Sequence, residues 1–349
     1  MKEQRRIAVY GAGAMGTVLG GFLSDCGLDA QVDLISRNRG HVEAMKEKGA
    51  RIVCAATGDT FTKSVSALMP EEMTEPYDVI FLMTKQRDNA RTAGFLKNFL
   101  KPDGALVTAQ NGLPEKGLAE VLGAERVYGA VCAWGANLVG DGVAELTSEP
   151  AAMTMEIGSY SGRCGKLKEI REILGAIGEI ADNPAFVTVT ENLAGARWSK
   201  LAINAAFSGL SVVTGFTFGE IARGKKSRRL ALGILRECFA VASASEIKLE
   251  KIQGHDMEKL LGGTGFFGTQ KALFLLPIAM KKHRLLVSGM LRDLERGRKC
   301  EIDYINGAVC KCGDGCSVDT PLCDKVVEIA HGIENGLYEI SGKNLDFFS

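Results

Sequence analysis

Short apolar runs alternate with helical patterns over the first half of the chain. We interpret the apolar runs as strands, at residues 7–10, 32–35, 79–83, 105–108, 127–133, 153–157 and 186–189. Helical spacing of apolar residues follows Gly13, His41, Asp88, Pro114 and Gly165. This alternation predicts an α/β fold with a mostly parallel, doubly wound sheet.

The strand-like runs stop near Glu191. Helical patterns then cover residues 192–211, 228–245, 256–261, 288–297 and 300–311. A chain of 349 residues is also too long for one typical hydrophobic core. We therefore expect an α/β domain over residues 1–190 and an all-helical domain over residues 191–349.

A glycine-rich turn joins the first predicted strand to the first predicted helix. It reads Gly11-Ala12-Gly13-Ala14-Met15-Gly16. In this context the first glycine permits a tight turn, the second lets a pyrophosphate approach the backbone, and the third allows close helix packing. The N–H groups at the start of the helix favour an anion. The turn predicts a Rossmann domain that binds a dinucleotide through these six residues.

The end of the second strand indicates which dinucleotide. Enzymes that use NAD usually carry an acidic residue there, to accept from the ribose 2′-hydroxyl. This chain has Ser36 followed by Arg37, and a guanidinium suits a 2′-phosphate. We therefore predict NADPH, with Ser36 and Arg37 as binding residues. The alternative is that Asp33 is the ribose acid, if the strand ends earlier.

Composition excludes several kinds of partner. Lys and Arg together number 42, as do Asp and Glu, so the formal net charge is zero and favours neither nucleic acid nor an anionic membrane. Residues 201–219 carry no charge, but polar residues interrupt them, so we expect a buried helix and not a membrane span.

Cysteine usage favours a cytoplasmic protein. Ten cysteines occur without a signal-peptide pattern at the N-terminus, which predicts reduced thiols. Cys310, Cys312, Cys316 and Cys323 do not match a zinc or iron–sulfur spacing. We expect no metal there and interpret these side chains as small packing residues.

Polar residues that carry chemistry follow two buried strands and line one helix. Lys85 and Asn111 lie at the carboxyl ends of strands, where doubly wound sheets bind ligands. Lys200, Asn204 and Ser208 fall on one helical face at i, i+4 and i+8, in an otherwise largely apolar segment. Such a stripe indicates either a functional site or a structural role, in which the lysine side chain extends from the core to reach solvent.

Several motifs, taken in order along the chain, resemble those of the 2-dehydropantoate 2-reductase (ketopantoate reductase) family. They are the glycine-rich turn, the strand-end lysine, the Gln110-Asn111-Gly112 turn, the run from Arg197 to Asn204, and Glu301-Ile302-Asp303-Tyr304-Ile305-Asn306-Gly307. The resemblance spans nearly the whole chain. It implies a Rossmann domain, a helical domain, and NADPH-dependent reduction of a 2-oxo acid in the cleft between them.

The resemblance also assigns roles to individual residues. Lys200 matches the general acid and Asn204 a substrate-binding residue, while Glu301 matches a glutamate near the substrate hydroxyl and the ribose. Lys85 and Asn111 match positions near the nicotinamide and the substrate, with Lys85 expected to contact both.

This chain departs from the family pattern around the substrate. Ser208 replaces a second asparagine, Gly289 stands where a serine is common although Ser288 is adjacent, and Asp88 and Pro114 replace Gln and Gly. We therefore expect the hydroxyl groups of Ser208 and Ser288 to bind the substrate in place of the amide and the serine that are common in the family.

The expected partner is a small 2-oxo acid substrate. We expect no binding to nucleic acid or to a membrane. A homodimer is one possible assembly. Alternatives to ketopantoate reduction are a reductase or opine-type dehydrogenase for another 2-oxo acid, and an NADPH-sensing protein without turnover.

Overall fold

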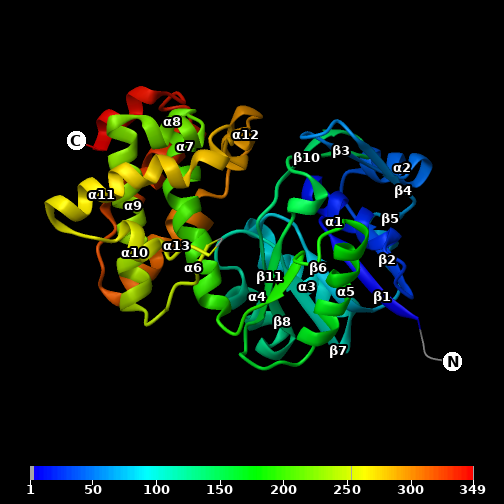
Figure 1. Ribbon diagram of the computed structural model, residues 1–349. Coiled ribbons are helices and arrows are strands. Elements are labelled where there is room, and N and C mark those ends of the chain that lie inside the picture. Colours follow the sequence, from blue (N-terminus) through cyan, green and yellow to red (C-terminus); the bar gives the residue numbers. More distant parts are fainter. Residues whose placement is uncertain (1–3, 253, 349) are drawn as a thin grey trace. The chain divides into compact units, whose positions relative to one another are not determined.

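The computed structural model describes residues 4–252 and 254–348, which form two compact units (Figure 1). The N-terminal unit contains residues 4–110 and 114–193. The C-terminal unit contains residues 111–113 and 194–348. The predicted domain boundary at residue 190 stays a prediction, which limited proteolysis would test.

An eight-stranded sheet forms the centre of the N-terminal unit, in the order β12-β11-β8-β7-β6-β1-β2-β5. Its strands are β1 (Arg5–Tyr10), β2 (Ala30–Ile35), β5 (Ser66–Leu68), β6 (Tyr77–Leu82), β7 (Leu100–Thr108), β8 (Val127–Cys132), β11 (Met155–Ser159) and β12 (Val187–Val189). The pairing of β8 with β11 is antiparallel, and the other neighbours are parallel. The predicted Rossmann-type, doubly wound fold class is thereby confirmed.

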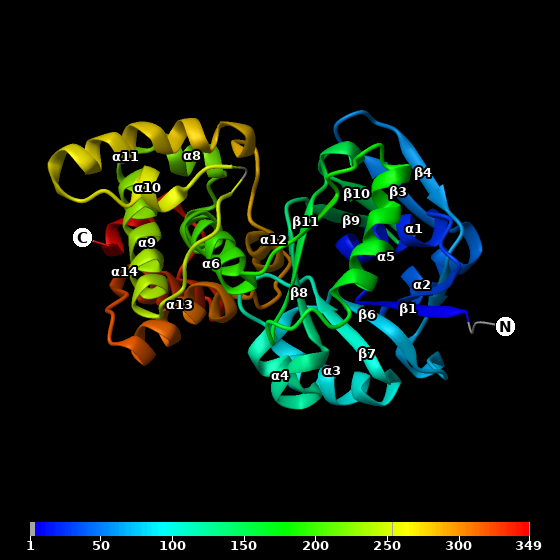
Figure 2. The same cartoon turned by 60° about the horizontal axis from the view of Figure 1, so that its bottom comes forward.

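Helices cover both faces of this sheet (Figure 2). They are α1 (Ala14–Asp25), α2 (Arg39–Lys48) and α5 (Leu167–Ile180) on one face, and α3 (Asn89–Leu96) and α4 (Glu115–Leu122) on the other. Successive residues of a strand point to opposite faces, so Ile7 and Val9 pack with α1 and α5. Ala8 and Tyr10 pack with α3 and α4. The strands between the two edge strands are mostly buried on both faces, which explains their nearly continuous apolar sequences, whereas β5 and β12 at the edges are partly exposed.

A second, four-stranded sheet lies beside α1 and was not predicted. Its strands, in spatial order, are β4 (Thr60–Lys63), β3 (Ala50–Cys54), β10 (Val143–Leu146) and β9 (Ala136–Gly140). β9 and β10 form a hairpin whose turn is Asp141-Gly142, with Gly142 at φ +71°. Asp-Gly between two strands is a strong hairpin signal, so this part of the sheet was detectable from the sequence.

The C-terminal unit is helical, as predicted. Its helices are α6 (Leu193–Ile203), α7 (Gly209–Thr214), α8 (Phe218–Arg223), α9 (Lys225–Ala244), α10 (Met257–Leu261), α11 (Gly265–Ala279), α12 (Gly289–Glu295), α13 (Ile302–Cys316) and α14 (Pro321–Glu334). A π-helical turn, Asn204–Ser208, joins α6 to α7, and a 3-10 segment, Gly342–Phe348, follows α14. Among its described residues the only β-type pairing is a bridge between Ile252 and His255. The pattern analysis missed α8, α11 and α14.

The uncharged stretch of residues 201–219 is not one helix, contrary to the prediction. The helical path ends at Thr214, because Gly215 adopts φ +78° and terminates α7. A new helix, α8, starts after Thr217, whose side chain caps it. Across the part of the chain that the structure describes, no helix has the length and apolar character needed to cross a bilayer.

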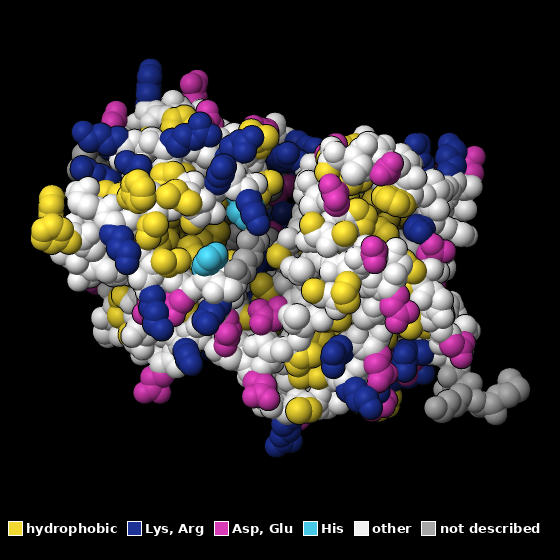
Figure 3. Space-filling view, viewed as in Figure 1, with side chains coloured by type: hydrophobic (Ala, Val, Ile, Leu, Met, Phe, Trp, Pro, Cys, Tyr) yellow, Lys and Arg dark blue, Asp and Glu magenta, His cyan; other side chains and the backbone are white. Residues whose placement is uncertain are grey.

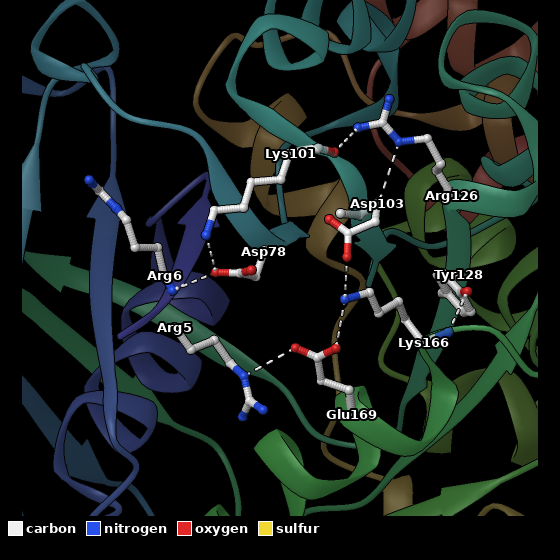
Figure 4. Close-up of polar contacts among 10 residues, drawn as sticks. Arg5, Arg6, Asp78, Lys101, Asp103, Arg126, Tyr128, Lys166 and Glu169 are labelled. Atoms are coloured by element: carbon white, nitrogen blue, oxygen red, sulfur yellow. Dashed lines mark hydrogen bonds and ion pairs between the residues drawn. The ribbon is translucent and has the colours of Figure 1, made fainter. Parts of the chain in front are cut away.

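Charged residues at the amino ends of the strands form a network (Figure 4). Glu169 of α5 accepts from Arg5 at 3.1 Å and from Lys166 at 2.9 Å. Lys166 also reaches Asp103 at 3.1 Å, and this hydrogen bond lowers the pKa of that carboxyl. Ligands of open α/β sheets bind at the carboxyl ends of the strands, so we assign this opposite edge to stability.

Candidate functional site

The glycine-rich turn closes tightly between β1 and α1. The amides of Gly11 and Ala12 both donate to the carbonyl oxygen of Ile35, at 2.9 and 2.8 Å. Gly11 has φ +100°, and a Cβ there would lie 2.6 Å from the amide nitrogen of Thr84. A Cβ on Gly16 would collide with the carbonyl oxygen of Gly11. The first and third glycines are therefore required by the turn itself.

Gly13 differs from these two glycines because the space beside it is open. A Cβ built on Gly13 meets no atom within 4 Å, so the fold does not need a glycine there. Gly13 is the N-cap of α1, which has no side-chain cap and no acidic residue in its first turn. An uncapped helix start beside open space fits a pyrophosphate, since the free N–H groups and the helix dipole favour an anion. This geometry fits a dinucleotide.

The carboxyl end of β2 lies at Ile35, so Ser36 and Arg37 follow the strand as predicted. Asp33 is inside the strand, paired with Ala8 and fully buried. Its carboxylate accepts from the side chains of Ser66 at 2.6 Å and Tyr77 at 2.9 Å, among others. The alternative in which Asp33 serves as the ribose acid is therefore wrong, because this carboxylate is satisfied inside the sheet.

Lys85 and Asn111 follow β6 and β7 by three residues each, and both are exposed. Gln110 joins the two strand ends: its Nε2 donates to the carbonyl oxygen of Thr84 at 2.8 Å. Gln110 and Asn89 also exchange two hydrogen bonds, at 3.0 and 2.7 Å. This amide pair was not among the predicted site residues, although Gln110 stands in the Gln110-Asn111-Gly112 turn.

Lys200, Asn204 and Ser208 form one half-exposed stripe in the C-terminal unit. Within residues 195–214, every side chain except these three and Ile203 is buried. The interruption of the α-helix falls on this stripe, since Asn204–Ser208 is π-helical. Single π turns inside α-helices occur frequently at functional sites. The predicted polar face therefore exists, although the backbone that carries it is not a continuous α-helix.

α12 and α13 pack against the π turn and bring two more predicted residues to this region. Ser288 is the N-cap of α12; it is 2% exposed, and its hydroxyl accepts from the amide of Met290 at 3.2 Å. Its own amide donates to Ser211 Oγ of α7. Glu301 is partly exposed at the N-cap of α13 and makes no capping bond with its side chain.

The predicted residues thus form two sets, each within its own unit. The set in the N-terminal unit lies at the carboxyl edge of the sheet and comprises the glycine-rich turn, Ser36, Arg37 and Lys85. The set in the C-terminal unit surrounds the π turn and comprises Lys200, Asn204, Ser208, Ser288 and Glu301. Asn111 is grouped with the C-terminal unit, together with Gly112 and Leu113.

The four C-terminal cysteines lie on two packed helices. Cys310, Cys312 and Cys316 are on α13 and Cys323 is on α14, and all four pack in the hydrophobic core of the C-terminal unit. Burial raises the pKa of Cys310 to about 12. All ten cysteines lie in the described part of the chain, and they are present as thiols.

A dinucleotide-binding sheet combined with a helical unit that carries a polar stripe defines a two-domain oxidoreductase. The model of the family "Ketopantoate reductase PanE/ApbA" matches residues 7–162, and that of its C-terminal domain matches residues 192–334. The chain belongs to the ketopantoate reductase family. This confirms the resemblance found in the motifs and identifies the chain as an oxidoreductase that uses a nicotinamide cofactor.

Similar proteins cover nearly the whole chain. A 2-dehydropantoate 2-reductase from Pyrococcus horikoshii is 26% identical over 91% of this chain and 93% of its own length. A ketopantoate reductase structure from Ralstonia eutropha has a TM-score of 0.77 at 25% identity, over 95% of this chain and 99% of that one. A D-mandelate dehydrogenase structure, solved with NADH and anilino(oxo)acetate, has a TM-score of 0.78 at 23% identity, over 95% of this chain and 99% of that one. The last comparison shows the shared fold alone.

Proposed function

We propose that this chain reduces a 2-oxo acid with NADPH, and that 2-dehydropantoate, reduced to pantoate, is the first substrate to test. The observation that carries the proposal is the half-exposed stripe of Lys200, Asn204 and Ser208 on an otherwise buried helix. A protein that only sensed NADPH would need no proton donor beside an amide and a hydroxyl. The names of the curated relatives support the same reaction.

The chemistry requires a proton donor near the substrate carbonyl. A nicotinamide, when bound, would supply the hydride that reduces the carbonyl carbon, and negative charge would develop on the carbonyl oxygen. Lys200 provides an ammonium group that stabilises this charge and donates a proton from Nζ. Asn204 lies one turn along the stripe and can hold the substrate by hydrogen bonds. Protonation of the oxygen completes the conversion of ketone to alcohol.

The remaining predicted residues bind the substrate in this proposal. Ser208 contributes a hydroxyl where relatives often have an amide, and Ser288 can donate its hydroxyl proton while it accepts from Met290. Glu301 accepts a substrate hydroxyl and Lys85 attracts the carboxylate. The shorter reach of Ser208 favours a second candidate, a larger or branched 2-oxo acid. An opine-type reductive condensation remains a variant of this second candidate.

Steady-state oxidation of the reduced cofactor with 2-dehydropantoate and a panel of other 2-oxo acids tests the proposal. Highest catalytic efficiency with 2-dehydropantoate would support the first candidate, and higher efficiency with a bulkier acid would support the second. Turnover that requires an added amine would indicate the opine-type reaction. Absence of turnover with every acid, despite cofactor binding, would contradict a reductase and favour the sensor.

NADPH is the cofactor we propose, because Arg37 follows β2 and is 71% exposed in its side chain. A charge-assisted hydrogen bond between the Arg37 guanidinium and the 2′-phosphate would contribute about 1.5–3 kcal/mol to the binding free energy. NADPH should therefore bind at least about tenfold more tightly than NADH, and Arg37→Ala should reduce this preference. Equal dissociation constants for the two cofactors in the unmodified chain would contradict NADPH as the preferred cofactor.

We also propose a homodimer of a cytoplasmic protein. Apolar side chains are exposed along α11 and just before α12, namely Phe266, Phe267, Phe274, Ile278 and Leu285, and Figure 3 shows hydrophobic side chains over α11. An exposed apolar surface of this kind is often covered by another chain. Light scattering measures the molar mass in solution and tests the homodimer. A dimeric unmodified chain and a monomeric Phe274→Ser variant would support a dimer formed through this surface. A monomeric unmodified chain would contradict it.

A further inference from the structure

Asp88, which we expected near the substrate, lies instead beside Arg37, although the two residues follow different strands. Arg37 follows β2, whereas Asp88 follows β6 at the start of α3, and β1 lies between these two strands. A guanidinium nitrogen of Arg37 is 3.8 Å from Oδ2 of Asp88. Both side chains are well exposed, at 71% and 46%, so the pair borders solvent at the carboxyl edge of the sheet.

The carboxylate of Asp88 is not used by the helix that it begins. Asp88 occupies the N-cap position of α3, where an aspartate usually accepts a hydrogen bond from a backbone amide. It makes no such bond, and its carboxylate lies near the guanidinium of Arg37. Local helix capping therefore does not explain this acidic residue.

Two arginines, Arg37 and Arg91, act on Tyr10 at the end of β1. Burial raises the pKa of Tyr10 at the end of β1, while the positive charges of Arg37 and Arg91 oppose this rise. Arg39 is engaged by another acid, Glu71, at 3.7 Å. The guanidinium groups of Arg37 and Arg91 thus favour an anion beside Tyr10, and Asp88 reduces that preference.

This arrangement matters because β2 lacks the ribose acid of enzymes that use NAD. Ser36 stands at the strand end, and Asp33 is buried inside the sheet. Asp88 supplies a carboxylate from a different strand. A carboxylate accepts a hydrogen bond from a ribose 2′-hydroxyl but repels a 2′-phosphate, which carries close to two negative charges.

We propose that Asp88 is a cofactor-specificity residue that acts against Arg37. Its carboxylate accepts a hydrogen bond from the 2′-hydroxyl of NADH and repels the 2′-phosphate of NADPH. Asp88 therefore reduces the preference for NADPH over NADH that Arg37 creates. This inference rests on the proposed function, since it requires the adenosine ribose to lie at the end of β2.

Direct titration of the full chain with NADPH and with NADH, followed by nicotinamide fluorescence at low salt, tests the inference. Asp88→Asn removes the charge at almost unchanged size. We expect the ratio of the dissociation constants of NADH and NADPH to rise about threefold to tenfold in this variant, because two like charges at a solvent-exposed surface repel weakly. The increase should become smaller in high salt.

Glu125→Gln is the matched control. Glu125 pairs with Arg163 at 2.9 Å, its side chain is 57% exposed, and it precedes β8 at the opposite edge of the sheet. This variant removes the same charge and should leave the cofactor ratio unchanged.

An unchanged ratio in Asp88→Asn, or an equal change in the control, would overturn the role of Asp88 alone. Binding of neither cofactor by the unmodified chain would overturn both this inference and the proposed function.

Discussion

Nδ2 of Asn306 donates a hydrogen bond to the carbonyl oxygen of Ala205, at 3.1 Å. Ala205 lies in the π turn between Asn204 and Ser208, and Asn306 is fully buried on α13. α13 approaches closely at Gly209, where a Cβ would lie 2.5 Å from Oδ1 of Asn306. Asn306 therefore links the helix that follows Glu301 to the turn that carries the polar stripe.

We expect Asn306→Leu to lower both stability and turnover. The buried carbonyl of Ala205 would lose its partner, which costs about 1–3 kcal/mol. Because the π turn positions Asn204 and Ser208, we expect kcat for the 2-oxo acid to fall while the dissociation constant of NADPH stays nearly constant. Urea denaturation and steady-state kinetics measure the two effects.

Asn344→Leu is the control for this variant. Asn344 is also buried, and its Nδ2 donates to the carbonyl oxygen of Val213 at 2.9 Å, near the end of α7. It should lower stability by a similar amount with little effect on kcat. Equal kcat values for the two variants would exclude a positioning role for Asn306.

Replacement of Lys200 by alanine should abolish most turnover. Loss of a general acid typically lowers the rate by about 10²–10⁴-fold. NADPH affinity should stay nearly constant, because the glycine-rich turn, Ser36 and Arg37 lie in the other unit. Single-turnover measurements with saturating NADPH would show the change in the chemical step. Lys259→Ala, on the exposed surface of α10, serves as the control. Near-normal turnover in Lys200→Ala would make Lys85 the next candidate acid.

Alanine substitutions at Gly13 and Gly16 should have different effects. The Cβ of Gly16→Ala collides with the carbonyl oxygen of Gly11, so we expect a loss of about 1–3 kcal/mol in the free energy of unfolding. Gly13→Ala meets open space and should retain stability. Its methyl group would occupy the proposed path of the pyrophosphate, so the NADPH dissociation constant should rise about tenfold or more.

Gly117→Ala in α4 is a control for both glycine variants, since its Cβ also meets no atom within 4 Å. It should raise the free energy of unfolding by up to about 1 kcal/mol, because alanine favours a helix more than glycine does, and leave NADPH binding unchanged. If Gly13→Ala bound NADPH as tightly as this control, the pyrophosphate would not approach Gly13.

Stability should decrease below neutral pH through His41. Its Nδ1 accepts from the amide of Gly142 at 2.8 Å, so Nε2 carries the proton and donates to Thr17 Oγ1 at 2.9 Å. Burial lowers the pKa of His41, although Asp141 opposes this shift. As the pH falls below about 6.5, the unfolded chain takes up a proton that the folded chain does not, so the stabilising contribution is lost.

Denaturation midpoints at pH 7.5 and pH 5.5 test this prediction. The decrease between the two values should be smaller in His41→Gln than in the unmodified chain, because glutamine does not titrate. His255→Gln, at an exposed histidine, should retain the full decrease. An identical decrease in all three proteins would show that His41 does not contribute.

The apolar pattern predicted the helices of the main sheet and all of its strands except β5, because most of these strands are buried on both faces, which leaves a continuous signal in the sequence. β5 was missed because it has three residues and is partly exposed at the sheet edge. The pattern also missed β4, where Thr60 and Thr62 are exposed and the run is short. It also missed α11, since Pro277 lies inside the helix and apolar side chains cover both its buried and its exposed faces.

The polar stripe could be predicted from the sequence, whereas the π turn that carries it and the hydrogen bond from Asn306 could not. Spacing along one helix identifies Lys200, Asn204 and Ser208, because i, i+4 and i+8 share a face. The π turn depends on packing against α13, and Asn306 and Ala205 are 101 residues apart in the sequence. The placement of Asp33 similarly required the hydrogen bonds that bury it, because the sequence alone does not fix where β2 ends.

The amide pair of Gln110 and Asn89 has a consequence for how activity will depend on acidity. It links the segment after β7 to the start of α3 through groups that neither gain nor lose a proton between acid and alkaline conditions. A carboxylate in either position would loosen this joint as it became neutral. The scaffold beside Lys85 therefore keeps its spacing over a wide range of pH, and this pair itself adds no inflection to a pH–rate profile.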